Sequence, residues 1–170
     1  MAMAFAGPIP WNVVNFFNKD NTRGLLVVHD VGTGKTLTAV TASQCFLEKY
    51  PQKNVIIITP TSLQKNFIKE LKKYGADSND SRYKYFTIHG INNSLSNNII
   101  TCDFFKDSLL IIDESHNLRK EDRNSKLAHN IITCAKECKK VLLLTATPLI
   151  NGPREIINLI RIINISLKNG

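Results

Sequence analysis

The sequence predicts an α/β domain in which a mostly parallel central sheet carries helices on both faces. Short runs of Val, Ile and Leu alternate with amphipathic segments along the chain, as in β-α-β units. Three of these apolar runs are nearly continuous, which is typical of strands covered on both faces. The 170 residues, of which 43% are hydrophobic and 21% charged, suit one domain with a buried core.

The order of the elements follows from the spacing of apolar residues. Five apolar runs are expected strands: Leu25–His29, Val55–Thr59, Tyr83–Ile88, Leu109–Ile112 and Val141–Thr145. Four segments with apolar residues at helical spacing are expected helices: Thr36–Lys49, Thr61–Tyr74, Arg123–Lys139 and Pro153–Ile163. Two polar segments rich in turn-forming residues, Gly75–Ser81 and His89–Asn98, are expected to be surface loops.

A glycine-rich segment, HDVGTGKT at residues 29–36, lies between the first expected strand and the first expected helix. Glycines let backbone N–H groups approach phosphate oxygens, the lysine reaches the β- and γ-phosphates, and the threonine hydroxyl binds Mg²⁺. The common signature has a further glycine where His29 stands, at the strand exit and away from the phosphates. Gly32, Thr33, Gly34, Lys35 and Thr36 are therefore candidate residues for binding ATP, with Thr36 also a candidate for Mg²⁺.

Two acids follow the fourth expected strand in LLIIDESHNLR, residues 109–119. An acid at the end of a strand beside a nucleotide site, here Asp113, can hold Mg²⁺ through water. The next carboxylate, Glu114, can orient or activate the attacking water. The alternative is that the two acids merely begin a loop, but four preceding aliphatic residues and the upstream phosphate loop favour the catalytic interpretation.

Hydroxyl residues follow the fifth expected strand in VLLLTATPLIN, residues 141–151. The carboxyl ends of strands border the ligand crevice of an open α/β sheet, so Thr145 and Thr147 are expected near the same ligand. All three segments thus converge on one edge of one sheet.

The charge and the cysteines limit the class of protein. The net charge of +8 and the sequence pI of about 9.4 fit contact with phosphate backbones, or alternatively a solvated basic surface. The four cysteines lack paired C-x-x-C spacing and are interpreted as reduced thiols of an intracellular protein. No apolar run is long enough for a membrane span, and residues 1–8 are interpreted as a flexible or added, non-native end.

The GKT, DESH and TATP segments, in this order, resemble motifs I, II and III of superfamily 2 helicases and translocases. In this superfamily the first motif tolerates other residues at the position of His29. The segment TPLINGPREIINLI resembles the Snf2-like branch. HDVGTGKT together with DESHNLR is also similar to the nucleoside triphosphatases and early transcription factor helicases of large cytoplasmic DNA viruses.

The resemblance implies a RecA-like P-loop NTPase lobe and assigns roles to further residues. His116, Thr145 and Thr147 would couple the nucleotide to the nucleic-acid surface, and Lys35, Asp113, Glu114 and His116 would be the catalytic set. Pro60, Thr61, Ser62 and Lys65 would contact the nucleic-acid backbone, although Lys65, Lys69, Lys72 and Lys73 equally suit a solvated helix face. Trp11 and Asn12 would lie at the adenine, although Trp11 is also compatible with an ordinary core aromatic.

Residues 1–170 are therefore interpreted as the first lobe of an ATP-driven translocase on nucleic acid, with duplex DNA favoured. Hydrolysis would need the second lobe of the same polypeptide, which carries the arginine finger, so the isolated lobe is expected to be monomeric and weakly active. The expected location is intracellular, in the host cytoplasm or the virion for a viral protein. An ATP-gated binding module is disfavoured by the presence of Glu114, and a small nucleotide kinase by DESH followed by TATP.

Overall fold

The computed structural model describes residue 15 and residues 19–28, 34–77, 79–118, 125–146 and 157–164. Its centre is a five-stranded sheet in the order β1-β5-β4-β2-β3, in which every neighbouring pair is parallel. The strands are β1 (Gly24–Val28), β2 (Val55–Ile58), β3 (Tyr83–Phe86), β4 (Leu109–Ile112) and β5 (Lys140–Thr145). The predicted α/β class with a parallel sheet is confirmed.

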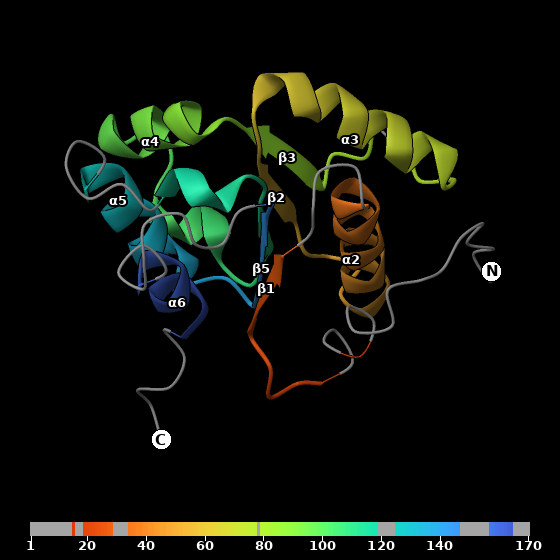
Figure 1. The fold of residues 1–170 in the computed structure, drawn as a ribbon, viewed down its shortest axis with the longest axis horizontal. Helices are drawn as coiled ribbons and strands as arrows, with labels where there is room; N and C mark the ends of the chain where they lie inside the picture. Colours follow the sequence, from red (N-terminus) through yellow and green to blue (C-terminus); the bar gives the residue numbers. More distant parts are fainter. Residues whose placement is uncertain are drawn as a thin grey trace.

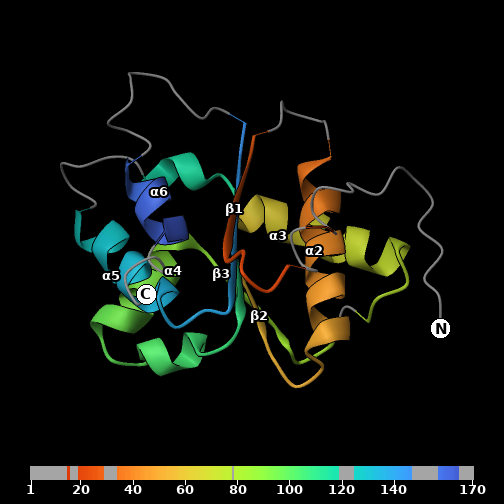
Figure 2. The ribbon, with the colours of Figure 1, turned by 90° about the horizontal axis from the view of Figure 1, so that it is seen from below.

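Helices cover both faces of this sheet. The α-helices are α2 (Lys35–Lys49), α3 (Thr61–Lys73), α4 (Ile88–Ser96), α5 (Ser125–Ala135) and α6 (Ile157–Asn164). Two 3₁₀-helices, η1 (Cys102–Phe105) and η2 (Ser115–Leu118), flank β4. Figure 1 presents the whole chain, and Figure 2 shows the sheet edge-on, with α2 and α3 on one side and α4, α5 and α6 on the other.

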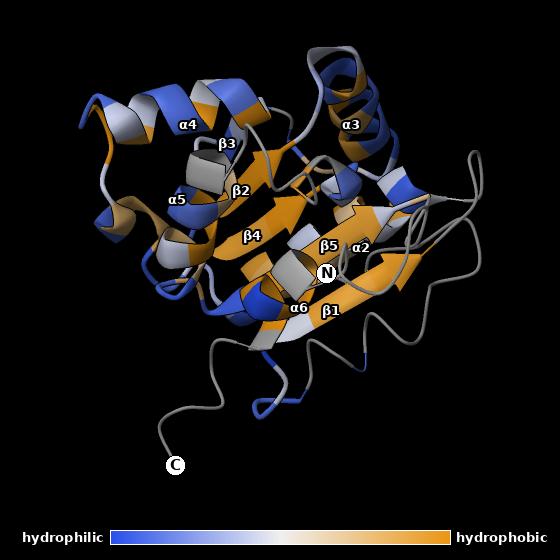
Figure 3. Ribbon diagram, turned by 60° about the vertical axis from the view of Figure 1, so that its left-hand side comes forward, coloured by the Kyte–Doolittle hydropathy of each residue, from blue (hydrophilic) through white to orange (hydrophobic). Residues whose placement is uncertain are grey.

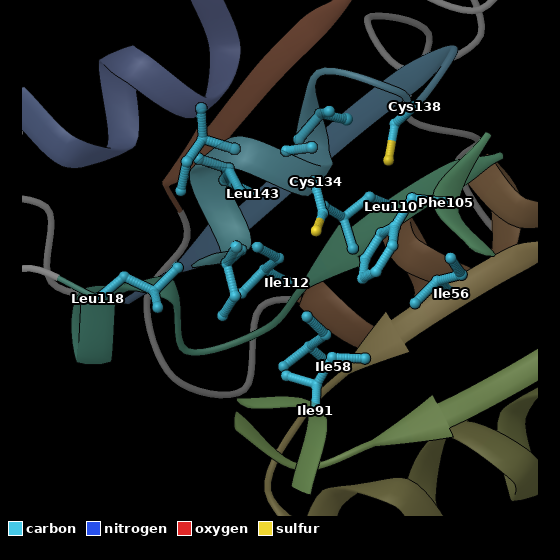
Figure 4. Packing of buried hydrophobic residues seen from close by; sticks show 14 of the residues in the cluster. Ile56, Ile58, Ile91, Phe105, Leu110, Ile112, Leu118, Cys134, Cys138 and Leu143 are labelled. Atoms are coloured by element: carbon cyan, nitrogen blue, oxygen red, sulfur yellow. The ribbon is translucent and has the colours of Figure 1, made fainter. Parts of the chain in front are cut away.

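The pleat of the strands divides the core into two clusters. Alternate side chains of a strand point to opposite faces, and β2 and β4, which are hydrophobic along their whole length (Figure 3), are therefore apolar on both. Val55 and Ile57 of β2 pack with the cluster under α2 and α3, whereas Ile56 and Ile58 pack with the cluster under α4, α5 and α6. Figure 4 shows the second cluster, where Ile91 and Phe105 approach the central strands.

The last described helix lies close to the first strand. A Cβ atom built on Gly24 would lie 2.9 Å from the backbone Cα of Ile163 in α6, closer than real Cβ contacts allow. The absence of a side chain at Gly24 therefore lets α6 pack directly on β1.

The structure corrects the interpretation of residues 88–98. The third strand ends at Phe86 and not at Ile88, and the segment predicted as a loop forms α4. Thr87 begins this helix, because its Oγ1 accepts a hydrogen bond from the Gly90 N–H at 3.0 Å. Ile91 is buried, and Ile88 and Leu95 pack against the same cluster at helical spacing. This apolar stripe outweighs the turn-forming asparagines and serines.

The prediction of four reduced cysteines is wrong for one pair. Cys102 in η1 and Cys134 in α5 form a disulfide across 32 residues of sequence, and Cys45 and Cys138 are free. The contact arises because η1 packs against α5, which brings together two cysteines whose sequence spacing carries no signal.

The helix predicted to reach Lys139 ends at Ala135, and the chain then turns into β5.

Candidate active site

The described residues of the three predicted motifs meet at one edge of the sheet. Because the five described strands are all parallel, their carboxyl ends lie on the same side. The strand order inserts β5 between β1, which leads to the phosphate loop, and β4, which leads to the two acids. Glycine and lysine at residues 34–35, the acids at 113–114 and the hydroxyl of Thr145 are thus delivered to a single region.

Gly34 and Lys35 form the start of α2. Gly34 has a φ of 97°, in the left-handed region that favours glycine, and Lys35 is the first helical residue. The helix has no side-chain cap and no acid in its first turn. Its first N–H groups and positive dipole end are therefore suited to an anion, and the adjacent Lys35 ammonium adds a full positive charge.

The Lys35 ammonium contacts the second of the two acids. Its Nζ lies 2.9 Å from Oε1 of Glu114, and both side chains are largely buried, at 13% and 22% exposure. A lysine and a carboxylate from elements far apart in sequence thus share one site. Their partial burial strengthens the interaction relative to an exposed surface pair.

The first acid, Asp113, is held by two donors. Its Oδ1 accepts a hydrogen bond from the Glu114 N–H at 2.9 Å, and its Oδ2 accepts one from the Thr59 hydroxyl at 3.2 Å. Burial is the main reason that the pKa of Asp113 is raised, and the charge of Glu114 adds to the rise, whereas these hydrogen bonds and Lys35 oppose it. Asp113 and Thr36 both line the same pocket, and their oxygen donors fit Mg²⁺.

Glu114 has an unusual backbone conformation. Its φ is 51°, in the left-handed region that residues other than glycine rarely adopt. In this turn, Oε1 of Glu114 contacts Lys35 and Oε2 lies 3.1 Å from Nδ1 of His116. Strained conformations of this kind are found at functional sites, where the surrounding contacts hold them.

His116 extends the site towards β5. Its Nδ1 lies 3.5 Å from the buried hydroxyl of Thr145, in addition to its shorter contact with Glu114. A continuous path of polar contacts therefore runs from Lys35 through Glu114 and His116 to the end of β5. The predicted proximity of these four side chains is observed.

A pocket of about 480 Å³ opens between the start of α2, the acids and α3. It is lined by Gly34, Lys35, Thr36, Leu37, Leu63, Asn66, Lys69, Glu70, Tyr74, Asp113 and Glu114. The sequence interpretation missed the contribution of α3. Leu63, Asn66, Glu70 and Tyr74 recur at helical spacing, which would have indicated a shared face but not what that face lines.

The remaining predicted residues fall into two groups. Trp11, Asn12, Gly32, Thr33 and Thr147 lie outside the described residues. Pro60 precedes the first turn of α3, and Thr61, Ser62 and Lys65 are exposed on its first two turns. Their exposure is compatible with contact to a nucleic-acid backbone and with a solvated surface. Within the described part of the chain, no helix is long and apolar enough to cross a membrane.

Fold and site together define a class of protein. The phosphate loop, the DE acids and the inserted strand between them make this chain a RecA-like P-loop lobe of the type found at the N-terminal side of superfamily 2 helicases. The family model described as "Type III restriction enzyme, res subunit" matches residues 11–150. The chain belongs to this family.

Similar proteins include several from large DNA viruses. The chain is 35% identical over 143 residues to the "Putative ATP-dependent RNA helicase L538" of Acanthamoeba polyphaga mimivirus, covering 84% of this chain and 29% of that protein. It is 30% identical over 159 residues to the "Termination factor NPH-I homolog" of African swine fever virus, covering 81% and 22%. The chain thus spans less than a third of the length of these relatives.

Solved structures share the fold. The "Sulfolobus solfataricus SWI2/SNF2 ATPase core in complex with dsDNA" superposes with a TM-score of 0.72 at 18% identity, covering 98% of this chain and 38% of that one. The "Pyrococcus furiosus Hef helicase domain" gives a TM-score of 0.66 at 21% identity, covering 92% and 36%. At sequence identities of 18% and 21%, the structural similarity shows a shared fold of the lobe and no more.

Proposed function

We propose that this chain is the ATP-binding half of a nucleic-acid-dependent motor that hydrolyses ATP together with a second lobe. The observation that carries the proposal is the Lys35–Glu114 pair at 2.9 Å, set beside Asp113 in a pocket at the start of α2. This arrangement provides a cation for phosphate oxygens, a carboxylate to position water, and oxygen donors for Mg²⁺.

Different residues of the pocket have separate roles in hydrolysis. The Lys35 ammonium and the N–H groups at the start of α2 bind the β- and γ-phosphates, and Glu114 accepts a proton from the attacking water. Asp113 and Thr36 hold Mg²⁺, which when bound neutralises phosphate charge. His116 transmits the position of Glu114 to Thr145 through the contacts of 3.1 and 3.5 Å.

We further propose duplex DNA as the nucleic acid. The Snf2-like TPLIN segment and the fold shared with a core bound to dsDNA support this choice, and RNA is the alternative outcome of the test. Pro60, Thr61, Ser62 and Lys65 would contact the backbone at the start of α3. Such contacts are indifferent to base sequence, and because Lys65 would neutralise a phosphate charge, binding should weaken as the salt concentration rises.

Nucleotide binding by this chain tests the first part of the proposal. A fluorescent ATP analogue should bind in the presence of Mg²⁺, and Lys35→Ala should weaken that binding by one to two orders of magnitude, roughly the loss of a charge-assisted hydrogen bond. Lys53→Ala is the matched control, because Lys53 pairs with Asp107 at the start of β4, at the opposite edge of the sheet. Equal affinity of the wild type and Lys35→Ala would refute the assignment of the site.

Turnover by the lone chain and by the two-lobe protein tests the second part. An arginine from the second lobe is expected to contribute roughly 10³–10⁵ to the rate, so the lone chain should hydrolyse ATP poorly with or without DNA. The two-lobe protein should be stimulated by duplex DNA more than by RNA of the same sequence. Robust, DNA-stimulated turnover by the lone chain would contradict the need for a second lobe.

A further inference from the structure

Thr59 lies where β2 ends and α3 is about to begin. The residue is almost fully buried, with 3% of its surface exposed, and its N–H continues the sheet by donating to the Phe86 carbonyl at 3.0 Å. Its hydroxyl donates to Oδ2 of Asp113 at 3.2 Å. A polar side chain in this position therefore reaches the first acid of the site from a neighbouring strand.

The register of the sheet explains this contact. Strands β2 and β4 are parallel and pair Ile58 with Ile112, so Thr59 and Asp113 each follow a paired residue. The Asp113 N–H donates to the Ile58 carbonyl at 2.9 Å, which holds the two chain segments together just beyond the strands. The pleat then points Thr59 and Asp113 towards the face covered by α2 and α3, where the pocket lies.

The two donors to Asp113 differ in kind. The Glu114 N–H is a backbone group, and its direction is set by the turn with a φ of 51° at Glu114. The Thr59 hydroxyl is a side chain on another strand, so it fixes the second carboxylate oxygen independently of that turn. With both oxygens held, the carboxylate has one orientation and still offers its remaining lone pairs to a ligand.

We propose that Thr59 is a positioning residue for Mg²⁺: its hydroxyl holds the Asp113 carboxylate in the orientation that binds the metal–nucleotide complex. This inference rests on the proposed function of the site. Because Pro60 follows Thr59 directly and precedes α3, the same residue also links the metal-binding acid to the helix whose first turns carry the proposed nucleic-acid contacts.

A matched set of variants separates this role from a structural one. Thr59→Val keeps the volume and removes the hydroxyl, whereas Thr59→Ser keeps the hydroxyl and removes a methyl group. Thr41→Val in α2 is the control, because Thr41 is equally buried and its hydroxyl has no hydrogen-bond partner among the described residues. Asp113→Asn completes the set, since Thr59 acts through Asp113.

The experiment is a titration of a fluorescent ADP analogue with each variant of the 170-residue chain, in EDTA and over a range of Mg²⁺ concentrations. Thr59→Val should raise the Mg²⁺ concentration needed for half-maximal binding roughly 10-fold or more, as removal of outer-shell partners of metal ligands does. Its affinity in EDTA should equal that of the wild type. Thr59→Ser and Thr41→Val should behave like the wild type. In the Asp113→Asn background, Thr59→Val should cause little further change in the Mg²⁺ concentration needed for half-maximal binding.

Other outcomes overturn the inference. If Thr59→Val binds the ADP analogue with the Mg²⁺ dependence of the wild type, the hydroxyl does not position the metal ligand. The same conclusion follows if Thr59→Ser raises the required Mg²⁺ concentration as much as Thr59→Val does. If Thr59→Val fails to fold, Thr59→Ala decides by the same titration, and failure of both variants to fold would make Thr59 a structural residue. Absence of nucleotide binding by the wild type would instead refute the proposed function itself.

Discussion

The disulfide between Cys102 and Cys134 provides a stability prediction whose size follows from the chain. Cross-linking two residues lowers the entropy of the unfolded state by an amount that grows with the logarithm of the enclosed loop. For the separation of 32 residues, the loop model gives about 3.5–4 kcal/mol at 25 °C. Reduction should therefore destabilise the folded chain by that amount.

The effect should be large in a melting experiment. For a chain of this length, 1 kcal/mol shifts Tm by about 2–4 °C, so the reductant should lower Tm by roughly 7–15 °C. The Cys102→Ala/Cys134→Ala variant should melt near the reduced wild type and should not respond to reductant. Cys45→Ala is the matched control, because Cys45 is free, and its response to reductant should match that of the wild type.

Thiol counting checks the bond directly. Air-oxidised wild type, unfolded without reductant and treated with a maleimide, should carry two labels by mass, on Cys45 and Cys138. After reduction the same treatment should add four. Four labels without reduction, or identical Tm values for oxidised and reduced protein, would show that the pair does not form and that the first interpretation of reduced thiols was right.

Three further predictions concern the acids, the sheet edge and a buried thiol. In the two-lobe protein, Glu114→Gln should lower ATP turnover by roughly 10²–10⁴ at nearly unchanged ATP affinity, because it removes the base; wild-type turnover would exclude that role. Gly24→Ala should lower Tm, because the new Cβ meets the backbone of Ile163, at a cost of about 1–3 kcal/mol; a melting curve equal to that of the wild type would mean that α6 packs elsewhere. Burial raises the pKa of Cys138 to about 12 from 9.0, so native Cys138 should resist maleimide at neutral pH. The unfolding free energy of the wild type should fall more steeply above pH 9 than that of Cys138→Ala. The same pH dependence of the unfolding free energy in both proteins would refute this.

The sequence was sufficient for the parts of the fold in which local pattern and burial agree. Strands β2 and β4 are continuous aliphatic runs, and they lie where expected because only full burial on both faces accommodates such runs. Helix α4 was missed because its asparagines, serines and glycine favour turns individually, whereas its stability comes from Ile91 and its neighbours packing on a tertiary surface. The intrinsic secondary-structure propensity of single residues predicts a segment poorly where tertiary packing determines its structure.

The residues of the site likewise divide into those that local sequence patterns predict and those that depend on tertiary structure. Lys35, Glu114, His116 and Thr145 could be brought together from sequence, because motif order and parallel strands place them at one edge. Thr59 could not, because its role depends on the register of β2 against β4, which no local pattern encodes. The pairing of Cys102 with Cys134 depends likewise on how η1 packs against α5.

The strand order has a consequence for synthesis on the ribosome. Among the strands that the structure describes, β1 pairs with β5 alone, Val28 lying opposite Thr145, so β1 has no described neighbour until β5, far along the chain, has emerged. At about 5–20 residues per second, the nascent chain carries this strand unpaired for roughly 10 seconds. During that time β2, β3 and β4 can already associate, since β2 pairs with both of the others. The phosphate loop should thus be among the last parts of the lobe to acquire its native shape, and an unpaired GLLVV segment is a natural target for a chaperone.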